Sequence, residues 1–434
     1  MRHPGIPHPG GEKSAMKRID ILPSKSAAHR MLIAAALCEE PCDVILSERS
    51  LDIEATENCL AEIRRVRKDE ATSEENGEAA EEAQLHCGES GSTFRFLIPL
   101  VAALGMDAKF YPEGRLSRRP LSPLVEELEK KGVTFSPLGA NPFHVKGQLE
   151  PGAFRIPGNV SSQYITGLLM ALPLLADDST IRVAGERQSM GYVNLTLQVL
   201  REFGIEIITE RMEEELVYRI PGNQKYRSPG TCKVEGDWSN AAFWLTAGVL
   251  GKEAVQVTGL NPNSAQGDRK IVKLLRQFGA KIEVQEDTVT AYPSGTSLRG
   301  IIIDASQIPD MVPALALVAS AANGTTEIRH AERLRLKESD RLMSVTEVLN
   351  ALGGRVEERP DGLVITGRGV LSGGRADGYN DHRIVMMAAI ASLITTDKVI
   401  LTGGAAVNKS YPTFFTVLEE NKMGNNLERR QRDD

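Results

Sequence analysis

The sequence lacks a long apolar segment, an excess of basic residues and a closely spaced cysteine pair. Its longest uncharged stretch, residues 156–176, contains too many glycine, proline and polar residues to span a membrane. Asp and Glu outnumber Lys and Arg by 58 to 51, and the net charge of −7 excludes a chain-wide attraction to nucleic acid or anionic lipid. Any anionic ligand must therefore be bound by a local basic cluster.

The cysteine spacings of common zinc sites and the Walker loop of nucleotide-binding proteins are also missing. The five cysteines include no C-x-x-C pair and match no common zinc spacing, which predicts free thiols in a reducing compartment and no metal site. There is no Walker loop, and the glycine-rich residues 367–374 are expected to form a turn. Residues 1–15 lack the apolar core of a signal peptide and are expected to be disordered. We therefore expect a cytoplasmic protein with no nucleic-acid or membrane partner, and we predict a monomer that binds small molecules.

One pattern recurs along the chain: an amphipathic helix that ends in a glycine and is followed by a β-like run. The glycines are Gly132, Gly204, Gly279 and Gly353, spaced 72, 75 and 74 residues apart. Fainter copies place equivalent positions at Arg64 and Lys422. The repeat predicts six α/β units. Residues 300–304, 363–366 and 399–403 are the expected strands. The charge-dense residues 64–84 are expected to form a solvated hairpin or loop.

Segments that combine small or hydroxyl residues with Lys or Arg occur in both halves of the chain. They are PSKSAAHR (23–30), CGESGSTFR (87–95), GRLSRRP (114–120), LKESDR (336–341), YNDHR (379–383) and NKSYP (408–412). Four of them lead into apolar helical runs, and we expect Ser24, Ser26 and Ser92 to be helix N-caps. Backbone N–H groups at helix starts and forked arginines bind phosphate and carboxylate, so the segments predict an anion site.

Together with GNVSSQY (158–164), VEGDWSNAAF (234–243) and IPDM (308–311), these segments closely resemble the EPSP synthase family from about residue 16 to 420. The resemblance implies a two-domain inside-out α/β barrel built from six βαβαββ units, three per domain. One domain would comprise residues 1–23 and 236–434 and the other residues 24–235, with the active site in the cleft between them. The cleft is expected to close on its substrates.

The resemblance also implies a reaction. The enolpyruvyl group of phosphoenolpyruvate would pass to the 5-hydroxyl of shikimate 3-phosphate by addition and elimination, with release of phosphate and with no cofactor. Asp310 would be the base and Glu338 the acid, with Lys25 and His382 assisting. Taken alone, Asp310 would also suit a helix N-cap, Glu338 and Arg341 a surface ion pair, and His382 a structural role.

Two ligand sets follow from the resemblance. Phosphoenolpyruvate would contact Lys25, Gly91, Arg119, Gln163, Arg341, Arg383 and Lys409. Shikimate 3-phosphate would contact Lys25, Ser26, Arg30, Ser161, Ser162, Gln163, Ser189, Tyr192, Asp310 and Lys337. Gly91 would also lie against glyphosate, which is expected to occupy the phosphoenolpyruvate site.

Three positions depart from the family pattern. Pro23 stands where many relatives have glycine, and Arg333 where some have asparagine. Glu89 lies in a segment that usually reads GNAGT and brings a carboxylate close to the expected anion site.

Three other functions deserve comparison. A UDP-N-acetylglucosamine enolpyruvyl transferase would carry a cysteine in the loop at 114–120, but no cysteine lies between Cys87 and Cys232. An RNA 3′-phosphate cyclase would need a basic surface and a nucleotide site. A catalytically silent anion-binding relative would not be expected to keep all the acid–base residues.

Overall fold

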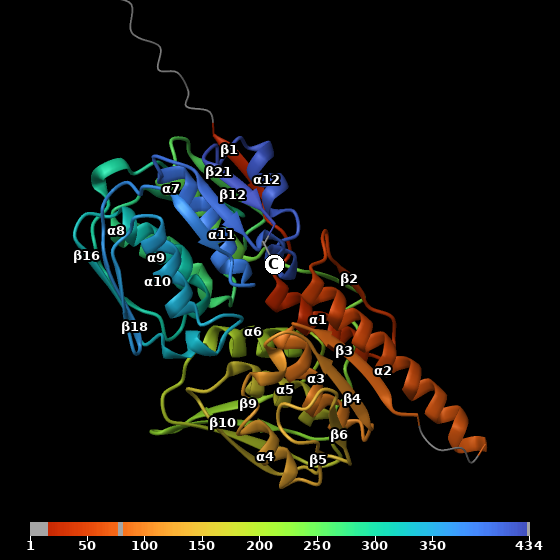
Figure 1. The fold of residues 1–434 in the computed structure, drawn as a ribbon. Coiled ribbons are helices and arrows are strands. Elements are labelled where there is room, and N and C mark those ends of the chain that lie inside the picture. Colours follow the sequence, from red (N-terminus) through yellow and green to blue (C-terminus); the bar gives the residue numbers. More distant parts are fainter. Residues whose placement is uncertain (1–15, 77–80, 432–434) are drawn as a thin grey trace, which may run out of the picture.

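The computed structural model describes residues 16–76 and 81–431, which form two lobes (Figure 1). One hydrophobic core draws on positions 19–22 and 238–418, and the other on positions 27–234. The two segments that connect the lobes pair with each other: Pro23 and Gly236 form an isolated antiparallel bridge, and Ser24 N–H donates to the Glu235 carbonyl at 2.7 Å. The disorder expected for residues 1–15 concerns residues outside the described range.

The lobe built on the 27–234 core is the lower one in Figure 1. Its α-helices are α1 (Lys25–Leu37), α2 (Leu51–Asn76), α3 (Gly91–Ala103), α4 (Leu124–Glu129), α5 (Ser162–Ala171) and α6 (Met190–Glu202). Its strands are β2 (Asp43–Ile45), β3 (Ala83–Gly88), β4 (Ala108–Pro112), β5 (Thr134–Phe135), β6 (Phe143–Lys146), β7 (Ala153–Pro157), β8 (Ser179–Ala184), β9 (Ile208–Arg211), β10 (Glu215–Ile220) and β11 (Thr231–Lys233).

The other lobe contains β1 (Lys17–Asp20) and most of the second half of the chain. Its α-helices are α7 (Trp238–Leu250), α8 (Ile271–Phe278), α9 (Val312–Ala321), α10 (Arg341–Ala351), α11 (His382–Ala391) and α12 (Phe414–Glu420). Its remaining strands are β12 (Val255–Thr258), β13 (Ile282–Gln285), β14 (Thr288–Ala291), β15 (Ile302–Asp304), β16 (Thr325–Arg329), β17 (Val356–Arg359), β18 (Gly362–Thr366), β19 (Gly374–Asp377), β20 (Val399–Thr402) and β21 (Leu427–Arg430).

Four sheets share one topology, in which a parallel pair is extended by an antiparallel hairpin. Their strand orders are β1-β12-β14-β13, β3-β4-β6-β5, β7-β8-β10-β9 and β15-β16-β18-β17. Strands β19, β20 and β21 form a parallel sheet, and β2 pairs with β11 in parallel. Parallel neighbours need a crossover, and helices such as α3 and α5 supply it.

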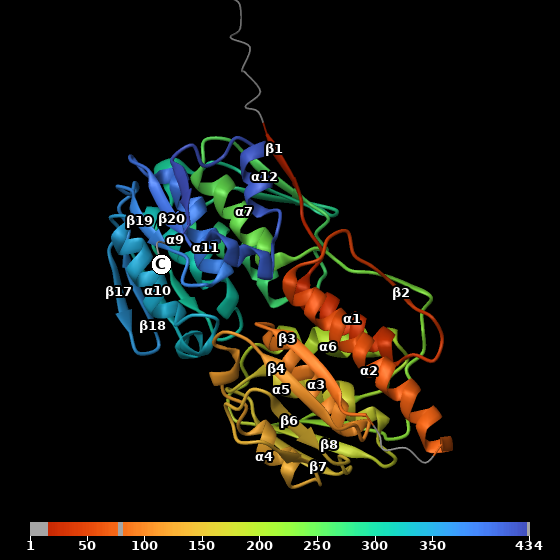
Figure 2. The ribbon, with the colours of Figure 1, turned by 45° about the vertical axis from the view of Figure 1, so that its right-hand side comes forward.

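The interior of the upper lobe is made of helices. Helices α7, α9 and α11 lie side by side there, and α9 and α11 bury every residue (Figure 2). Their sequences are apolar on all sides, which requires that a helix be enclosed rather than lie on a surface. The sheets of the upper lobe therefore form its outer layer around these helices. The N-terminal end of α11 points toward the other lobe.

The glycine repeat and the β-like runs predicted four helix ends and three strands correctly. Gly132, Gly204, Gly279 and Gly353 follow helices with φ angles of 87°, 75°, 103° and 89°, the left-handed backbone that glycine adopts without strain. The expected strands correspond to β15, β18 and β20, and residues 367–374 form the expected irregular connection up to the start of β19.

The prediction of a hairpin or loop over residues 64–84 is wrong. Helix α2 runs through this region to Asn76, and β3 begins at Ala83. Arg65 contacts Glu62 and Asp69 at 2.9 and 3.0 Å, the spacing of neighbours on one helix face. The charges therefore belong to a solvated helix face. Helix α2 is the longest described helix, and none in the described ranges is long and apolar enough to cross a membrane.

Candidate active site

A cavity lies between the two lobes and is lined by residues from both. It brings together segments that are far apart in the sequence, from the start of α1 to the start of α11. Of the substrate and catalytic residues implied by the family resemblance, all but Lys409 line it. They are Lys25, Ser26, Arg30, Gly91, Arg119, Ser161, Ser162, Gln163, Ser189, Tyr192, Asp310, Lys337, Glu338, Arg341, His382 and Arg383.

The helices that begin at this cavity include α1, α3, α5, α10 and α11. Each is capped by a side chain that accepts a hydrogen bond from a backbone N–H group of the first turn. The caps are Ser24, Ser90, Ser161, Asp340 and Asp381. The unpaired N–H groups and the positive end of the helix dipole both favour anions. The backbone thus adds to the positive potential of the basic side chains.

The capping prediction is right for Ser24 and wrong for two other serines. Ser26 and Ser92 already lie in the first turns of α1 and α3, where a side chain cannot act as the N-cap. Ser90 caps α3 instead, and its hydroxyl also accepts a hydrogen bond of 2.7 Å from Thr93. This contact fixes the first turn of the helix that begins at Gly91.

Asp310 is the most heavily contacted carboxylate of the cavity. Its Oδ1 accepts from Arg341 at 2.7 Å and its Oδ2 from the Tyr192 hydroxyl at 2.5 Å. Lys337 lies 3.4 Å and Arg383 3.5 Å from Oδ1. Burial alone would raise the pKa of Asp310, but the charges of Lys337, Arg383 and Arg341 hold this pKa well below its ordinary value. The group is therefore ionised and can accept a proton. It lies in the 3-10 helix η5 (Pro309–Met311) and caps no helix.

Glu338 shares the same arginine. Arg341 donates to it at 2.7 Å, and Arg119 from the other lobe lies 3.8 Å away. Burial would raise the pKa of Glu338, but Arg341 and then Arg119 lower it well below the ordinary value. Arg341 is 1% exposed and also pairs with the buried Asp381 at 2.7 Å. The pair of Glu338 and Arg341 is thus part of a buried network, not a surface ion pair.

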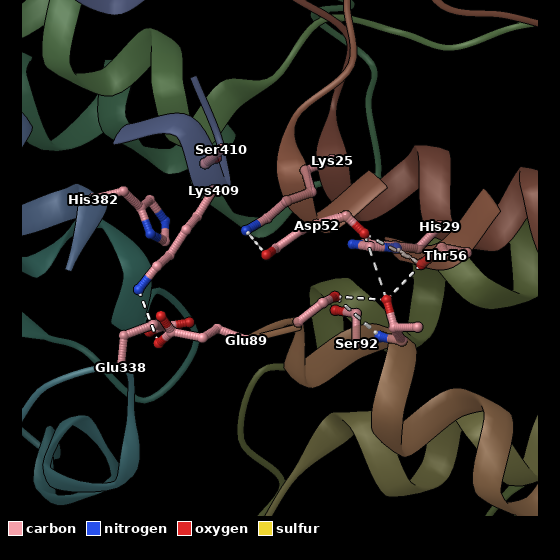
Figure 3. A network of polar contacts seen from close by, with 12 residues as sticks. Lys25, His29, Asp52, Thr56, Glu89, Ser92, Glu338, His382, Lys409 and Ser410 are labelled. Atoms are coloured by element: carbon pink, nitrogen blue, oxygen red, sulfur yellow. Dashed lines mark hydrogen bonds and ion pairs between the residues drawn. The ribbon is translucent and has the colours of Figure 1, made fainter. Parts of the chain in front are cut away.

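Lys25 and His382 face the cavity from opposite lobes (Figure 3). The Lys25 ammonium donates to Asp52 at 2.7 Å, and its backbone N–H donates to Asp237 of the other lobe at 3.0 Å. Burial, then the charges of Lys25 and Arg383, lower the pKa of His382 well below its ordinary value. Neither ring nitrogen has a hydrogen-bond partner among the described residues. His382 is therefore a neutral ring with one free donor and one free acceptor.

Two arginines flank the start of α3. Arg95 donates to Gln163 at 2.9 Å, and burial, followed by repulsion from Arg119, lowers its pKa to about 10. Arg119 donates to the Leu336 carbonyl of the other lobe at 3.1 Å. A Cβ on Gly91 would lie 2.8 Å from Arg95 and 3.0 Å from Arg119. The missing side chain therefore lets both guanidinium groups approach the helix terminus.

The remaining expected residues differ in how they are held. Arg30 is enclosed by the hydroxyls of Thr196 and Thr166 at 2.8 and 3.2 Å, and burial lowers its pKa to about 9. Ser189 accepts a hydrogen bond of 2.8 Å from Arg333 of the other lobe, and both residues line the cavity.

Lys409 lies outside the cavity lining. It pairs with Glu89 of the opposite lobe at 2.9 Å (Figure 3).

The site residues that were not predicted from the sequence include three charged ones. Arg95 ends the segment 87–95 and Asp381 lies within 379–383, so the motifs carried a signal for both. Asp52 lies in no recognised motif, and only the tertiary contact with Lys25 identifies it. Among the described residues, no cluster of three or more His, Cys, Asp or Glu could hold a metal ion.

The family model for EPSP synthase (3-phosphoshikimate 1-carboxyvinyltransferase) matches residues 11–418. The chain belongs to the EPSP synthase family. A relative from Clostridium kluyveri named 3-phosphoshikimate 1-carboxyvinyltransferase is 41% identical over 403 residues, covering 92% of this chain and 93% of the relative. One of the same name from Clostridium acetobutylicum is 42% identical over 414 residues, covering 93% and 94%.

Solved structures agree with the EPSP synthase fold. An EPSP synthase from Acinetobacter baumannii has a TM-score of 0.72 at 22% identity, covering 95% of this chain and 96% of that one. The enolpyruvyl transferase NikO from Streptomyces tendae has a TM-score of 0.71 at 19% identity, covering 95% and 96%. At these identities the likeness establishes a mixed α/β fold of the EPSP synthase kind.

Proposed function

We propose that the chain transfers the enolpyruvyl group of phosphoenolpyruvate to the 5-hydroxyl of shikimate 3-phosphate and releases phosphate. Membership of the EPSP synthase family supports this reaction. The observation that carries the proposal is the convergence of Asp310 and Glu338 on Arg341 in a cavity otherwise rich in cations. Both substrates carry a phosphate and a carboxylate, so cations from two lobes would offset their mutual repulsion and hold them close together.

The two substrates would occupy different parts of the cavity. Shikimate 3-phosphate would lie against the starts of α1 and α5 and near Tyr192, within reach of Asp310. Phosphoenolpyruvate would lie against the start of α3, between Arg119 and Arg341. By the family resemblance Gln163 would contact both substrates. Its amide accepts from Arg95 at 2.9 Å and donates to Ser92 at 3.2 Å.

In the addition step, the shikimate 5-oxygen would form a bond to C2 of phosphoenolpyruvate. Asp310 would take the hydroxyl proton, and C3 would gain a proton from Glu338, converting the methylene into a methyl group. In the elimination step, the bond between C2 and the phosphate oxygen would break, and a methyl proton would return to Glu338. Phosphate would leave with both electrons of the broken bond and with the proton that Asp310 had taken, so that both carboxylates return to their starting state. Lys25 and the neutral His382 would stabilise the charges that develop.

The roles of the two carboxylates require a change of environment on binding. Cations hold the pKa of both Asp310 and Glu338 well below its ordinary value, so Glu338 has no proton to donate and Asp310 is a weak base. Substrate phosphates and carboxylates would share the charges of Arg341 and Lys337. The pKa of both side chains would then rise toward the range in which proton transfer is efficient.

The proposal extends to the architecture. Residues 24–235 would form one domain, and residues 1–23 with 236–434 the other, each containing three βαβαββ units. The two separate hydrophobic cores and the repeated sheet topology support this division. We place the enzyme in the cytoplasm as a monomer that needs no cofactor.

Phosphate release tests the reaction and its nearest rival together. The chain should release phosphate from phosphoenolpyruvate with shikimate 3-phosphate and not with UDP-N-acetylglucosamine. The reverse preference would establish the rival activity. Failure with both acceptors would establish a catalytically silent relative.

A further inference from the structure

Glu89 links the two lobes at the edge of the cavity. It lies in the turn between β3 and α3, and its carboxylate contacts Lys409 and Asn380, both from the other lobe. The Lys409 ammonium lies 2.9 Å away, and the Asn380 amide nitrogen donates to both carboxylate oxygens at 2.9 and 3.1 Å. The side chains of Lys409 and Glu89 are 8% and 24% exposed, so water screens this pair only in part.

Lys409 is also the one expected substrate residue that does not line the cavity within the described chain. An ammonium group has three hydrogen-bond donors. One donates to the Asn380 carbonyl at 2.7 Å, and a second faces Glu89. Figure 3 shows the Lys409 side chain directed at Glu89. The carboxylate thus occupies one donor position of the ammonium, for which an anionic ligand would have to compete.

Two backbone features accommodate this arrangement. A Cβ on Gly114 would lie 2.7 Å from the Glu89 carboxylate, so the glycine leaves the space that the carboxylate fills. Tyr379 and Asn380 have φ angles of 50° and 51°, a left-handed backbone that is uncommon outside glycine. This turn directs the backbone carbonyl of Asn380 to Lys409 and the side-chain amide of Asn380 to Glu89. The surrounding backbone therefore shapes the contact between Glu89 and Lys409.

We propose that Glu89 is an internal competitor for Lys409 and thereby sets the affinity for the enolpyruvyl donor. The inference rests on the proposed function, in which Lys409 contacts phosphoenolpyruvate. A donor phosphate or carboxylate must displace Glu89 before it can use this ammonium. Glu89 then keeps its two contacts with Asn380, so the displaced carboxylate is not left without a partner.

Glu89→Gln should lower the KM for phosphoenolpyruvate by roughly fivefold, the ratio that corresponds to about 1 kcal/mol and lies at the upper end for partly exposed ion pairs. Glu113→Gln is the matched control. It removes an exposed carboxylate next to Gly114 and should change the KM less than twofold. A Lys409→Met background distinguishes competition between Glu89 and the donor for Lys409 from direct repulsion between Glu89 and the anionic donor. There, Glu89→Gln should change the KM less than twofold.

Steady-state kinetics at saturating shikimate 3-phosphate measures all these values. An unchanged or raised KM in Glu89→Gln would overturn the inference, as would a fivefold drop that persists without Lys409. If the wild type releases no phosphate from phosphoenolpyruvate, the proposed function fails separately. Inorganic phosphate then provides the test. Glu89→Gln should reach the same rise in unfolding temperature at about fivefold lower phosphate, and equal phosphate requirements would refute the competition.

Discussion

Arg341 and Asp310 form a buried ion pair with 2.7 Å between Nη1 and Oδ1. The same guanidinium binds Glu338 and Asp381, so one side chain holds the proposed base, the proposed acid and the cap of α11. Arg341 begins α10, which places its charge at a helix N-terminus that already favours anions. Asp310, Glu338 and Asp381 all pair with Arg341, and their negative charges offset the repulsion among the basic side chains of the cavity. The cavity can therefore hold many cations without destabilising the fold.

Loss of Arg341 should therefore be costly for stability. Arg341→Met leaves buried carboxylates without their main partner and should lower the free energy of unfolding by about 3–5 kcal/mol. Arg335→Met is the matched control, because Arg335 also pairs with two carboxylates, at 3.0 and 2.6 Å, but is 30% exposed. The control should cost less than about 1 kcal/mol. Urea unfolding measures both, and equal losses would contradict a structural role specific to Arg341.

Asp310→Asn should reduce turnover by about 10²- to 10⁴-fold, because an amide cannot take the hydroxyl proton. The affinity for shikimate 3-phosphate should stay within about tenfold, because the amide retains an acceptor for Tyr192 or Arg341. Asp361→Asn, at an exposed position, serves as the control. Turnover near the wild-type value in Asp310→Asn would remove this residue from the base role.

His29 predicts how stability depends on pH. Burial, then the charges of Lys25 and Arg30, lower its pKa well below the ordinary value. The unfolded chain therefore binds more protons at this position as pH falls below about 6.5, and stability must decrease with it. Between pH 7.5 and 5.5 the wild type should lose about 1.4 kcal/mol more than His29→Gln. Urea unfolding at the two pH values provides the comparison, and parallel losses would show that His29 is protonated in the folded state.

Gly91→Ala should disturb the anion site while preserving the fold. The atoms nearest to the added Cβ would be the ends of Arg95 and Arg119, which are flexible side chains that can move by a few tenths of an ångström. Overpacking that costs about 1–3 kcal/mol lowers the affinity of a bound ligand by roughly 5- to 150-fold. Glyphosate is longer than phosphoenolpyruvate, so its affinity should fall more. Inhibition constants and the KM for phosphoenolpyruvate measure the two effects, and an equal loss of both ligands would contradict this geometry.

The sequence predicted local features better than tertiary ones. The glycine-terminated helices before Gly132 and Gly279 were evident because a left-handed C-cap is a local requirement. The part of helix α2 beyond Arg64 was missed because it carries few apolar residues, and Arg65 pairs with Glu62 and Asp69 within the helix as well as with Glu81 beyond it. The pairing of Lys25 with Asp52 joins α1 to α2, and no spacing in the sequence reveals which carboxylate that lysine meets.

The contact between Glu89 and Lys409 shows the same limit. The sequence indicated a carboxylate near the anion site, but 320 positions separate it from Lys409. Only the packing of the lobes shows that this lysine is paired with Glu89 while Arg341, Arg383 and Lys337 line the cavity.

Deuterium incorporation tests the central claim most directly. With phosphoenolpyruvate and shikimate 3-phosphate in D₂O, the addition–elimination route passes through a methyl group, so solvent deuterium should appear in the vinyl group of the product as phosphate is released. Proton and phosphorus NMR follow both changes in one sample. Phosphate release with a fully protonated vinyl group would contradict proton transfer to C3 by Glu338, and the absence of both product and phosphate would contradict the proposed reaction itself.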